Sequence, residues 1–265
     1  MKKMISLALA LAMGLSLAAC SGKDAKNTEP TSDLAYVQDK GSLVVGITEF
    51  EPMDYQDDNG NWVGFDADMA TLFAESLGVD VEFQLIDWDS KTMELDGKTI
   101  DVVWNGMTLN DEVKAAMECS NPYFDNAQVV IVPADKAAEY QTVESVQDLA
   151  FSVEVGSAAK AQAEEYGFNY TEAADQATAL LEVSSGTADA AIIDYLMSVA
   201  MTGEGTSYAD LTSTVSLNTE QYGVGFRKGS DLAEELNKFF AEKYADGTMK
   251  EIADKYGIAD KLVAQ

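Results

Sequence analysis

Segments typical of β-strands and of α-helices alternate twice along this chain, and this alternation limits its fold more than any other feature. Such an order is typical of α/β sheets with parallel strands. In the first half we expect strands at residues 43–47, 79–85 and 101–104, and helices at 65–77 and 91–95. In the second half we expect strands at 128–132, 151–155, 169–171 and 189–193, and helices from 158 and at 174–184. The chain therefore predicts two α/β lobes of similar build.

The last third of the chain ends this alternation. After residues 224–226, two helices are expected at 231–244 and 249–256, separated by the turn residues Asp246 and Gly247. Apart from a polar stretch near the N-terminus, the chain shows no internal repeat and no low-complexity region.

The N-terminus is typical of a secretory signal that ends in a lipid-attachment site. A lysine pair precedes an apolar run at 5–15, and small residues then lead to Cys20. The alternative, a membrane-spanning anchor, needs about 20 apolar residues, which this run does not reach. We expect residues 1–19 to be a signal peptide, Cys20 to carry the lipid, and the polar residues 20–33 to form a flexible tether. The folded part would then be extracytoplasmic and anchored to the cell membrane.

The charge and the residues that are missing argue against several classes of function. Removal of residues 1–19, which hold two lysines and no acid, takes the formal net charge from −29 to −31. This charge argues against nucleic-acid binding and mildly favours cationic or zwitterionic ligands, although a soluble acidic surface explains it more simply. The chain has no histidine, and Cys119 is the only cysteine besides Cys20. We therefore expect no intramolecular disulfide, no metal site, no cofactor and no histidine-based catalysis.

The segment 101–120 is the most informative part of the sequence. The expected strand at 101–104 runs into a turn formed by Asn105, Gly106, Met107 and Thr108. A helix opened by Asn110 follows, and its first backbone N–H groups are free. In α/β sheets, ligands bind at the carboxyl ends of the strands. The sequence therefore predicts a ligand site at this turn.

Five motifs occur in an order and spacing that resembles one known family. They are GFDADMA (64–70), WNGMT (104–108), SNPYF (120–124), DAAIID (189–194) and YGVGFRKGS (222–230). Together they resemble the extracellular solute-binding proteins of family 3, the receptors of polar amino-acid ABC importers. The likeness extends over residues 43–256, which is nearly all of the mature chain.

The resemblance implies a two-lobed α/β fold of the periplasmic-binding-protein type. Each lobe would be a mixed sheet flanked by helices, and two hinge strands would join the lobes. The first lobe would comprise residues 34–124 and 222–265, and the second residues 125–221, with the crossings near 123–126 and 221–223. The ligand would lie in the cleft between the lobes, and a hinge motion would close the cleft around it.

The resemblance also implies which residues of the first lobe hold the ligand. Phe50 and Trp88 match two aromatic positions after strand ends, whose rings enclose the apolar part of the ligand and attract ammonium groups. Core packing is the alternative role for both rings. Glu49 would meet an ammonium group or remain solvated. At the turn, the residues that match ligand contacts are Asn105, Gly106, Met107 and Thr108, and a tight turn without a ligand is the alternative.

In the second lobe, two short segments match the family's ligand contacts. Gly156, Ser157 and Ala158 end a strand and start a helix, which offers backbone N–H groups and a hydroxyl to an anion. The family's usual threonine is Ala158 here. Asp194 matches the aspartate that pairs with the ligand's α-ammonium group, and a carboxylate at the end of an apolar strand needs a cationic partner. The alternative role for Asp194 is to cap the helix that follows.

Val113 is the main departure from the family. The matching position usually holds an arginine that binds the ligand's α-carboxylate, whereas the only arginine of this chain is Arg227. Truncating one partner of such a pair costs roughly 2–5 kcal/mol. Four explanations stay open: Lys114, Lys91, backbone donors at 110–112 or 156–158, or a ligand without an α-carboxylate, such as an amine or a quaternary ammonium ion.

The resemblance predicts a monomeric, lipid-anchored receptor that captures a small polar ligand, most simply an amino acid, and delivers it to an ABC permease in the membrane. The alternatives are a receptor for an amine, a sensor that signals through a separate membrane partner, and an enzyme, because some dehydratases share this fold. Carboxylate pairs such as Glu49 and Glu51 could perform acid–base chemistry. The absence of histidine and of a recognisable reactive thiol argues against an enzyme.

Overall fold

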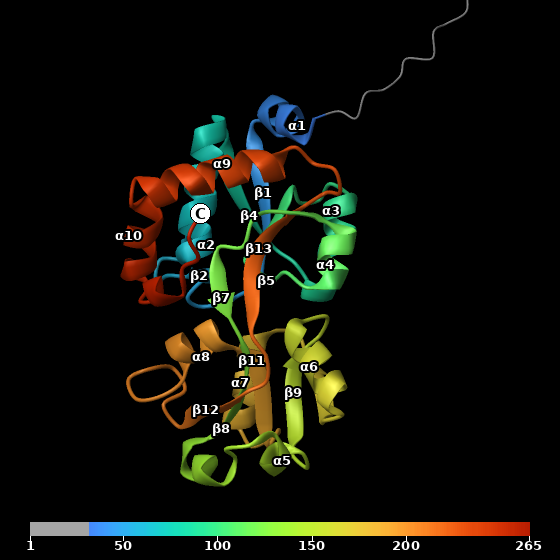
Figure 1. Cartoon of the computed structure of the whole chain (residues 1–265), viewed down its shortest axis with the longest axis vertical. Helices are drawn as coiled ribbons and strands as arrows, with labels where there is room; N and C mark the ends of the chain where they lie inside the picture. The colour runs from blue at the N-terminus through green and yellow to red at the C-terminus, as the bar shows by residue number, and fades with distance from the viewer. Residues whose placement is uncertain (1–31) are drawn as a thin grey trace, which may run out of the picture. The chain divides into compact units, whose positions relative to one another are not determined.

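Two large β-sheets form the strand framework of residues 32–265, the part of the chain that the computed structural model describes (Figure 1). The strands of the first sheet are β1 (Ser42–Ile47), β4 (Asp80–Leu85), β5 (Val102–Thr108), β6 (Glu118–Cys119), β7 (Phe124–Asn126) and β13 (Glu220–Phe226). Their order is β4-β1-β5-β13-β6, and β7 pairs with β13. The strands of the second sheet are β8 (Gln128–Pro133), β9 (Ala150–Glu154), β10 (Asn169–Ala173), β11 (Ala190–Asp194) and β12 (Leu211–Ser216), in the order β10-β9-β11-β8-β12. A small hairpin joins β2 (Tyr55–Gln56) to β3 (Trp62–Val63).

Both large sheets contain parallel and antiparallel pairs. In the first sheet, β1 runs parallel to β4 and β5, whereas β13 runs antiparallel to β5. In the second sheet, β9 runs parallel to β10 and β11, whereas β8 runs antiparallel to β11 and β12. The parallel strands of each sheet bring their carboxyl ends to one edge, where ligands of α/β proteins bind. The prediction of a two-lobed α/β fold with a mixed sheet in each lobe is confirmed.

Helices cover both sheets in the described part of the chain. They are α1 (Asp33–Lys40), α2 (Phe65–Leu77), α3 (Lys91–Asp96), α4 (Asp111–Ala116), α5 (Val143–Val146), α6 (Ala158–Tyr166), α7 (Gln176–Ser184), α8 (Tyr195–Met201), α9 (Leu232–Ala245) and α10 (Thr248–Lys255), with 3-10 turns η1 (Trp88–Ser90), η2 (Ala134–Glu139) and η3 (Ala259–Lys261). Figure 1 shows α2, α9 and α10 on one side of the first sheet and α3 and α4 on the other. No helix within residues 32–265 has the length and apolar character that a membrane span requires.

The predicted turn at residues 105–108 is wrong, because these residues continue strand β5. Met107 and Thr108 pair with residues of β13, and the register of that pairing shifts nearby. Gly106 has a φ of 55°, which glycine adopts without strain and other residues rarely adopt. The segment is therefore an irregular strand end rather than a loop, held in place by hydrogen bonds on both sides.

The predicted tether extends two residues too far. Ser32 caps helix α1 through a hydrogen bond from the amide of Ala35, and Asp33 begins the helix. Asp33 also accepts a hydrogen bond of 3.0 Å from Arg227, which ties the start of α1 to the first sheet. These contacts order both residues. The signal peptide, Cys20 and the rest of the tether fall on residues 1–31, outside the described residues.

Aromatic side chains hold α2 and α9 on the first sheet. Trp104 of β5 is fully buried, and its ring contacts Phe73 of α2 and Phe240 of α9 at centroid distances of 6.2 and 5.6 Å. Burying one such ring stabilises the fold by roughly 1.5–3 kcal/mol. Trp62 lies half-buried against Phe83. Trp104 and Trp62 therefore belong to the packing of the first lobe.

Two chain segments cross between the sheets. The chain passes from β7 to β8 near Asn126 and returns from β12 to β13 near Glu220, and these two residues pair across β7 and β13. Both crossings lie near the lobe boundaries expected at 124/125 and 221/222, and the boundaries stay a prediction. The paired crossings bring the polar strand ends of both sheets together.

Candidate functional site

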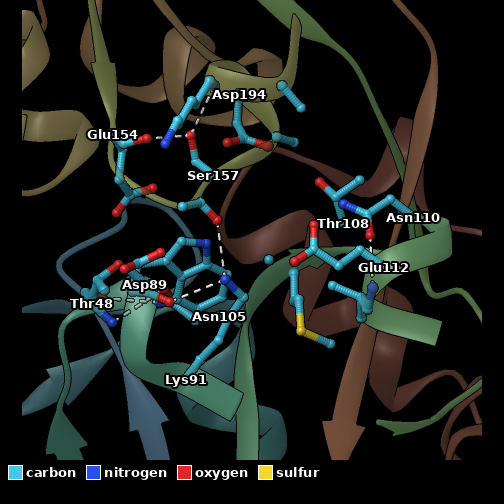
Figure 2. A pocket seen from close by; sticks show the side chains of 18 of the residues that line it. Thr48, Asp89, Lys91, Asn105, Thr108, Asn110, Glu112, Glu154, Ser157 and Asp194 are labelled. Atoms are coloured by element: carbon cyan, nitrogen blue, oxygen red, sulfur yellow. Dashed lines mark hydrogen bonds between the residues drawn. The ribbon is translucent and has the colours of Figure 1, made fainter. Parts of the chain in front are cut away.

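A cavity of about 300 Å³ lies between the two sheets, where residues at the carboxyl ends of β1, β5, β9 and β11 meet (Figure 2). Figure 2 shows Glu154, Ser157 and Asp194 on the side of the second sheet, opposite Thr48, Asp89 and Asn105 of the first lobe. Parallel strands of both lobes thus end at one space. This is where a ligand is expected in an α/β protein.

Eleven of the twelve residues that the sequence assigned to the ligand line this cavity. They are Phe50, Trp88, Asn105, Gly106, Met107, Thr108, Val113, Gly156, Ser157, Ala158 and Asp194. Glu49 is exposed and is not among the lining residues. Its neighbour Thr48 lines the cavity instead, because successive residues at the end of a strand face opposite sides.

Phe50 and Trp88 are almost fully buried, with 3% and 7% of their surfaces exposed. The Phe50 ring lies against Gly106, where an added Cβ atom would come within 2.4 Å of the ring. The Trp88 ring carries the ammonium group of Lys91 at 4.7 Å from its centroid. Both rings therefore pack against cavity residues of their own lobe and leave little of their surface for a ligand.

Asn105 uses its side chain inside the first lobe. Its Oδ1 accepts hydrogen bonds from the amide and the hydroxyl of Thr48, at 3.1 and 2.7 Å. Its Nδ2 donates to the carbonyl of Thr48 and to Asp54 Oδ2, at 3.0 and 2.8 Å. The two donor hydrogens of the amide are thus used, and Asn105 ties β5 to the end of β1.

Two carboxyl groups lie buried beneath Asn105 and Gly106. Asp66 Oδ2 accepts hydrogen bonds from the Gly106 amide and the Tyr123 hydroxyl, and Asp54 Oδ2 accepts one from Asn105. Burial raises the pKa of Asp66 to about 7 and raises the pKa of Asp54 well above its usual range, with the charge of Asp66 adding to the latter shift. Burial therefore favours the protonated forms of both carboxyl groups below the cavity.

Asp194 is held by four uncharged donors. Its Oδ1 accepts hydrogen bonds from Asn126 (2.5 Å), Gln128 (3.1 Å) and the Tyr222 hydroxyl (2.7 Å), and its Oδ2 accepts one from Gln176 (2.6 Å). Burial raises the pKa of Asp194 to about 7, and the charge of Glu220 adds to the rise. Asp194 occupies the N-cap position of α8 but makes no capping hydrogen bond with its side chain. These four hydrogen bonds hold the Asp194 carboxyl group at the cavity but supply no positive charge to pair with it.

Glu154 is a second buried carboxyl group on the same side. It ends β9, has 3% of its surface exposed and lines the cavity beside Asp194. Burial raises the pKa of Glu154 to about 8, and the charges of Asp194 and Asp175 contribute to the rise. The sequence analysis missed Glu154, because the strand was expected to extend to Val155. The rule that identified Asp194, a polar residue at the end of an apolar strand, also applies to Glu154.

Lys91 reaches from α3 across to the second lobe. Its Nζ donates to the carbonyl oxygens of Trp88 and of Gly156, each at 3.1 Å. Burial lowers the pKa of Lys91, whereas the charges of Glu154, Asp89 and Glu112 raise it. The lobes also touch at Gly156, where an added Cβ atom would come within 2.6 Å of Asp89 Oδ1. Of the cations that the sequence analysis named, Lys91 lies in the cavity.

Neither Val113 nor Lys114 places a positive charge in the cavity. Val113 has 7% of its surface exposed and belongs to an apolar cluster with Trp88, Met107 and Met117, so its side chain offers no donor. The amide of Val113 donates to Asn110 Oδ1 at 2.8 Å. Lys114 is exposed and does not line the cavity. The backbone amide of Val113 is therefore already used in the N-cap of α4 and is not available to a ligand.

The start of α6 lies next to Lys91, whose Nζ contacts the Gly156 carbonyl just before this helix. Ser157 caps the helix by accepting a hydrogen bond from the Lys160 amide at 3.2 Å, and its hydroxyl donates to the Glu154 carbonyl at 2.7 Å. The hydroxyl is therefore used within the protein. The first amides of a helix have no intrahelical acceptor, so the amide of Ala158, which lines the cavity, can bind an anion.

The cavity as a whole is acidic. Its lining contains five carboxyl groups and two lysines, namely Asp89, Glu112, Glu154, Glu164 and Asp194 against Lys91 and Lys160. Within residues 32–265, no three histidine, cysteine or acidic side chains are arranged to hold a metal ion. Such a lining favours a ligand that carries positive charge, and it offers a small number of polar groups that orient the ligand.

The chain matches characterised proteins along most of its length. Residues 43–259 match the model of the bacterial extracellular solute-binding proteins, family 3. The L-cystine-binding protein TcyJ of Escherichia coli (strain K12) is 28% identical over 93% of this chain and 94% of TcyJ. The arginine-binding extracellular protein ArtP of Bacillus subtilis (strain 168) is 27% identical over 98% of this chain and 100% of ArtP.

Solved structures show the same arrangement. The crystal structure of a mutant of ArgBP from T. maritima has a TM-score of 0.79 and 31% sequence identity to this chain, and it covers 84% of this chain and 98% of the ArgBP chain. The match therefore includes both lobes and the cavity between them. From the family match over residues 43–259 and the agreement in fold, this chain belongs to the bacterial extracellular solute-binding proteins of family 3.

Proposed function

We propose that this protein is the lipid-anchored receptor of an ABC importer and that it captures a polar amino acid in the cavity between its lobes. The observation that carries the proposal is Asp194, a buried carboxyl group that four uncharged donors aim into a cavity between two lobes. A buried carboxylate without a cation is costly, and the ammonium group of an amino acid supplies that cation.

The size and shape of the cavity suit this ligand class. A volume of about 300 Å³ is at the lower end of the range for small-molecule sites. The two lobes contact each other beside the cavity at Gly156, and we expect them to separate when a ligand enters and to close around it. The relatives TcyJ and ArtP are named for binding L-cystine and arginine, both of which carry an α-ammonium group.

The anchoring part of the proposal rests on the N-terminal sequence. Small residues precede Cys20 after a lysine pair and an apolar run. This pattern directs secretion and lipid attachment. A lipid on Cys20 together with the polar stretch that follows would hold the receptor near its permease.

The test is a binding screen on the purified protein, freed of bound ligand by unfolding and refolding. We expect at least one of the twenty common amino acids, or cystine, to raise the melting temperature, and calorimetry to give a 1:1 stoichiometry. Asp194→Asn should weaken that ligand about 30-fold or more, because the ammonium group loses its charged partner. Glu49→Gln, an exposed change outside the cavity, is the matched control and should bind normally.

Two outcomes would contradict the proposal. One is that no amino acid shifts the melting temperature at millimolar concentration. The other is that Asp194→Asn and Glu49→Gln bind equally well, which would remove Asp194 from the ligand site. Conversion of the bound compound during incubation, detected by mass spectrometry, would instead indicate an enzyme of this fold.

A further inference from the structure

Lys91 is the cavity group whose role the proposed function leaves unexplained. Of the two lysines in the lining, Lys160 forms an ion pair of 2.8 Å with Glu172. Lys91 donates only to two carbonyl oxygens and forms no ion pair with any carboxylate in residues 32–265. Its ammonium group has three N–H donors, so one remains available. Lys91 is half-buried, and withdrawing an ammonium group from water without pairing it with an anion costs free energy.

The surroundings of Lys91 add further donors. The Gly156 carbonyl that it contacts directly precedes the N-cap of α6, Ser157. Ala158, the first residue of this nine-residue helix, lines the cavity, and its amide has no intrahelical acceptor. An ammonium donor and the positive end of a helix therefore meet on one side of an otherwise acidic cavity. This combination suits a carboxylate.

Nearby acids leave the charge of Lys91 available. Glu154 is a buried acid of the second lobe that faces Lys91, and burial raises the pKa of Glu154 to about 8. Asp89 and Glu112 also face Lys91 from the first lobe, and their charges favour the protonated form of the lysine. The acids that face Lys91 therefore favour its cationic form, which can bind an anion.

We propose that Lys91 anchors the carboxylate of the bound amino acid and thereby selects amino acids over the corresponding amines. This inference rests on the proposed function. Lys91 binds the ligand's carboxylate together with the amide that begins α6, while Asp194 binds the ammonium group. The position of Val113 then needs no charge, because the donor arrives from α3 instead.

The experiment compares each amino acid with its decarboxylated counterpart: L-arginine with agmatine, L-lysine with cadaverine, and L-histidine with histamine. Calorimetry on the wild-type protein identifies the pair with the tightest amino acid. Lys91→Met keeps the length of the side chain and its packing on Trp88 but removes the charge. It should weaken the amino acid about 30-fold or more and change the amine less than about 3-fold, so that the preference for the amino acid largely disappears.

Two further variants keep the test decisive. Lys91→Arg retains a charged donor and should retain most of the preference. Lys114→Met removes the same charge from an exposed position outside the cavity and should bind like the wild type. Melting temperatures of all variants without ligand establish that they fold, and Lys91→Gln replaces Lys91→Met if the latter is unstable.

Different failures have different meanings. If the wild type binds none of the amino acids offered here or in the broader screen, the proposed function fails and the role of Lys91 fails with it. If the wild type binds an amino acid but Lys91→Met weakens the amino acid and the amine equally, Lys91 only holds the lobes together. That result, or unchanged binding of both compounds, would overturn this inference and leave the proposed function intact.

Discussion

Two cations of this protein, the buried Arg227 and the half-buried Lys91, show opposite ways of placing a positive charge in a fold. Arg227 donates to Asp33 and Asp101, at 3.0 and 3.4 Å, and to the carbonyl oxygens of Leu95 and Ile100. Lys91 has acidic neighbours but donates only to carbonyl oxygens. The charge of Arg227 is neutralised by ion pairs within the protein, whereas the charge of Lys91 remains available to a ligand.

The difference follows from what each cation holds together. Arg227 follows β13 and joins α1 to the end of the first sheet, where Asp101 also accepts hydrogen bonds from Lys40 and from the amide of Val44. Lys91 joins two lobes that must separate to admit a ligand. A cation paired to carboxylates in its own lobe stabilises that lobe, while one that spans the cleft links stability to the closed state.

The largest expected effect comes from breaking the Arg227 side of this comparison. Arg227→Met leaves Asp33 and Asp101 without their guanidinium partner, and removing one member of a buried ion pair costs about 3–5 kcal/mol. We expect this loss in the free energy of unfolding, measured by urea denaturation. The folded fraction should bind its ligand with unchanged affinity.

Lys228→Met, next to Arg227 but exposed, serves as the control and should lose little stability. A loss below about 1 kcal/mol for Arg227→Met would show that Asp33 and Asp101 remain buried at little cost without the arginine. The contrast drawn between Arg227 and Lys91 would then be wrong.

A change of pH should produce the next largest effect, because it changes the protonation of the buried carboxyl groups in and below the cavity that contains Lys91. Burial raises the pKa values of Asp66 and Asp194 to about 7 and that of Glu154 to about 8, above the usual values near 4. Between pH 4 and 8 the folded state therefore binds protons that the unfolded state has released, so stability falls as pH rises. We expect the melting temperature of the ligand-free protein to fall by about 5 °C or more between pH 5.5 and 8.5.

Glu154→Gln isolates one of these groups. The variant cannot lose a proton at this position, so its melting temperature should depend less on pH than that of the wild type. An equal slope for both proteins would mean that Glu154 titrates like an exposed acid. A cationic amino acid at saturating concentration should likewise reduce the slope, because its ammonium group stabilises the ionised carboxylates.

The smallest effect is expected from a cation that is paired but exposed. Lys238 on α9 forms ion pairs of 2.9 Å with Glu234 and with Glu235. Solvent and salt screen such pairs, so Lys238→Met should change the melting temperature by no more than about 1 °C. Differential scanning calorimetry measures this change. A shift in melting temperature as large as that of Arg227→Met would show that ion pairing, rather than burial, decides how much a cation stabilises this protein.

Much of the site could be predicted because the end of each buried strand is recognisable in the sequence as a polar residue after an apolar run. Asp194 follows four apolar or small residues of β11, which predicted a buried carboxyl group at a strand exit. Thr48 and Glu49 show the limit, because a shift of one residue decides which side chain enters the cavity. Glu154 obeys the same rule as Asp194, and only the expected end of its strand was misplaced.

Other features depend on residues that are distant in the sequence. Asn105 was expected to face the ligand, but its side chain is held by Thr48 and Asp54, 57 and 51 residues away. The hydrogen bonds of Asp194 come from Asn126, Gln128 and Tyr222 on both crossings between the lobes. No local pattern predicts such contacts, because they form only when the two sheets are assembled.

The sequence by itself determined the alternation of strands and helices and the resemblance to the family, because periodicity and motif spacing are local properties of the chain, and the mixed sheets were expected from that resemblance. It also identified Val113 as the position where the expected charge is missing. Only the tertiary structure decided which cation enters the cavity. Lys91 lies 22 residues before Val113 and contacts Gly156, 65 residues further along the chain, so their proximity results from the packing of two lobes rather than from spacing.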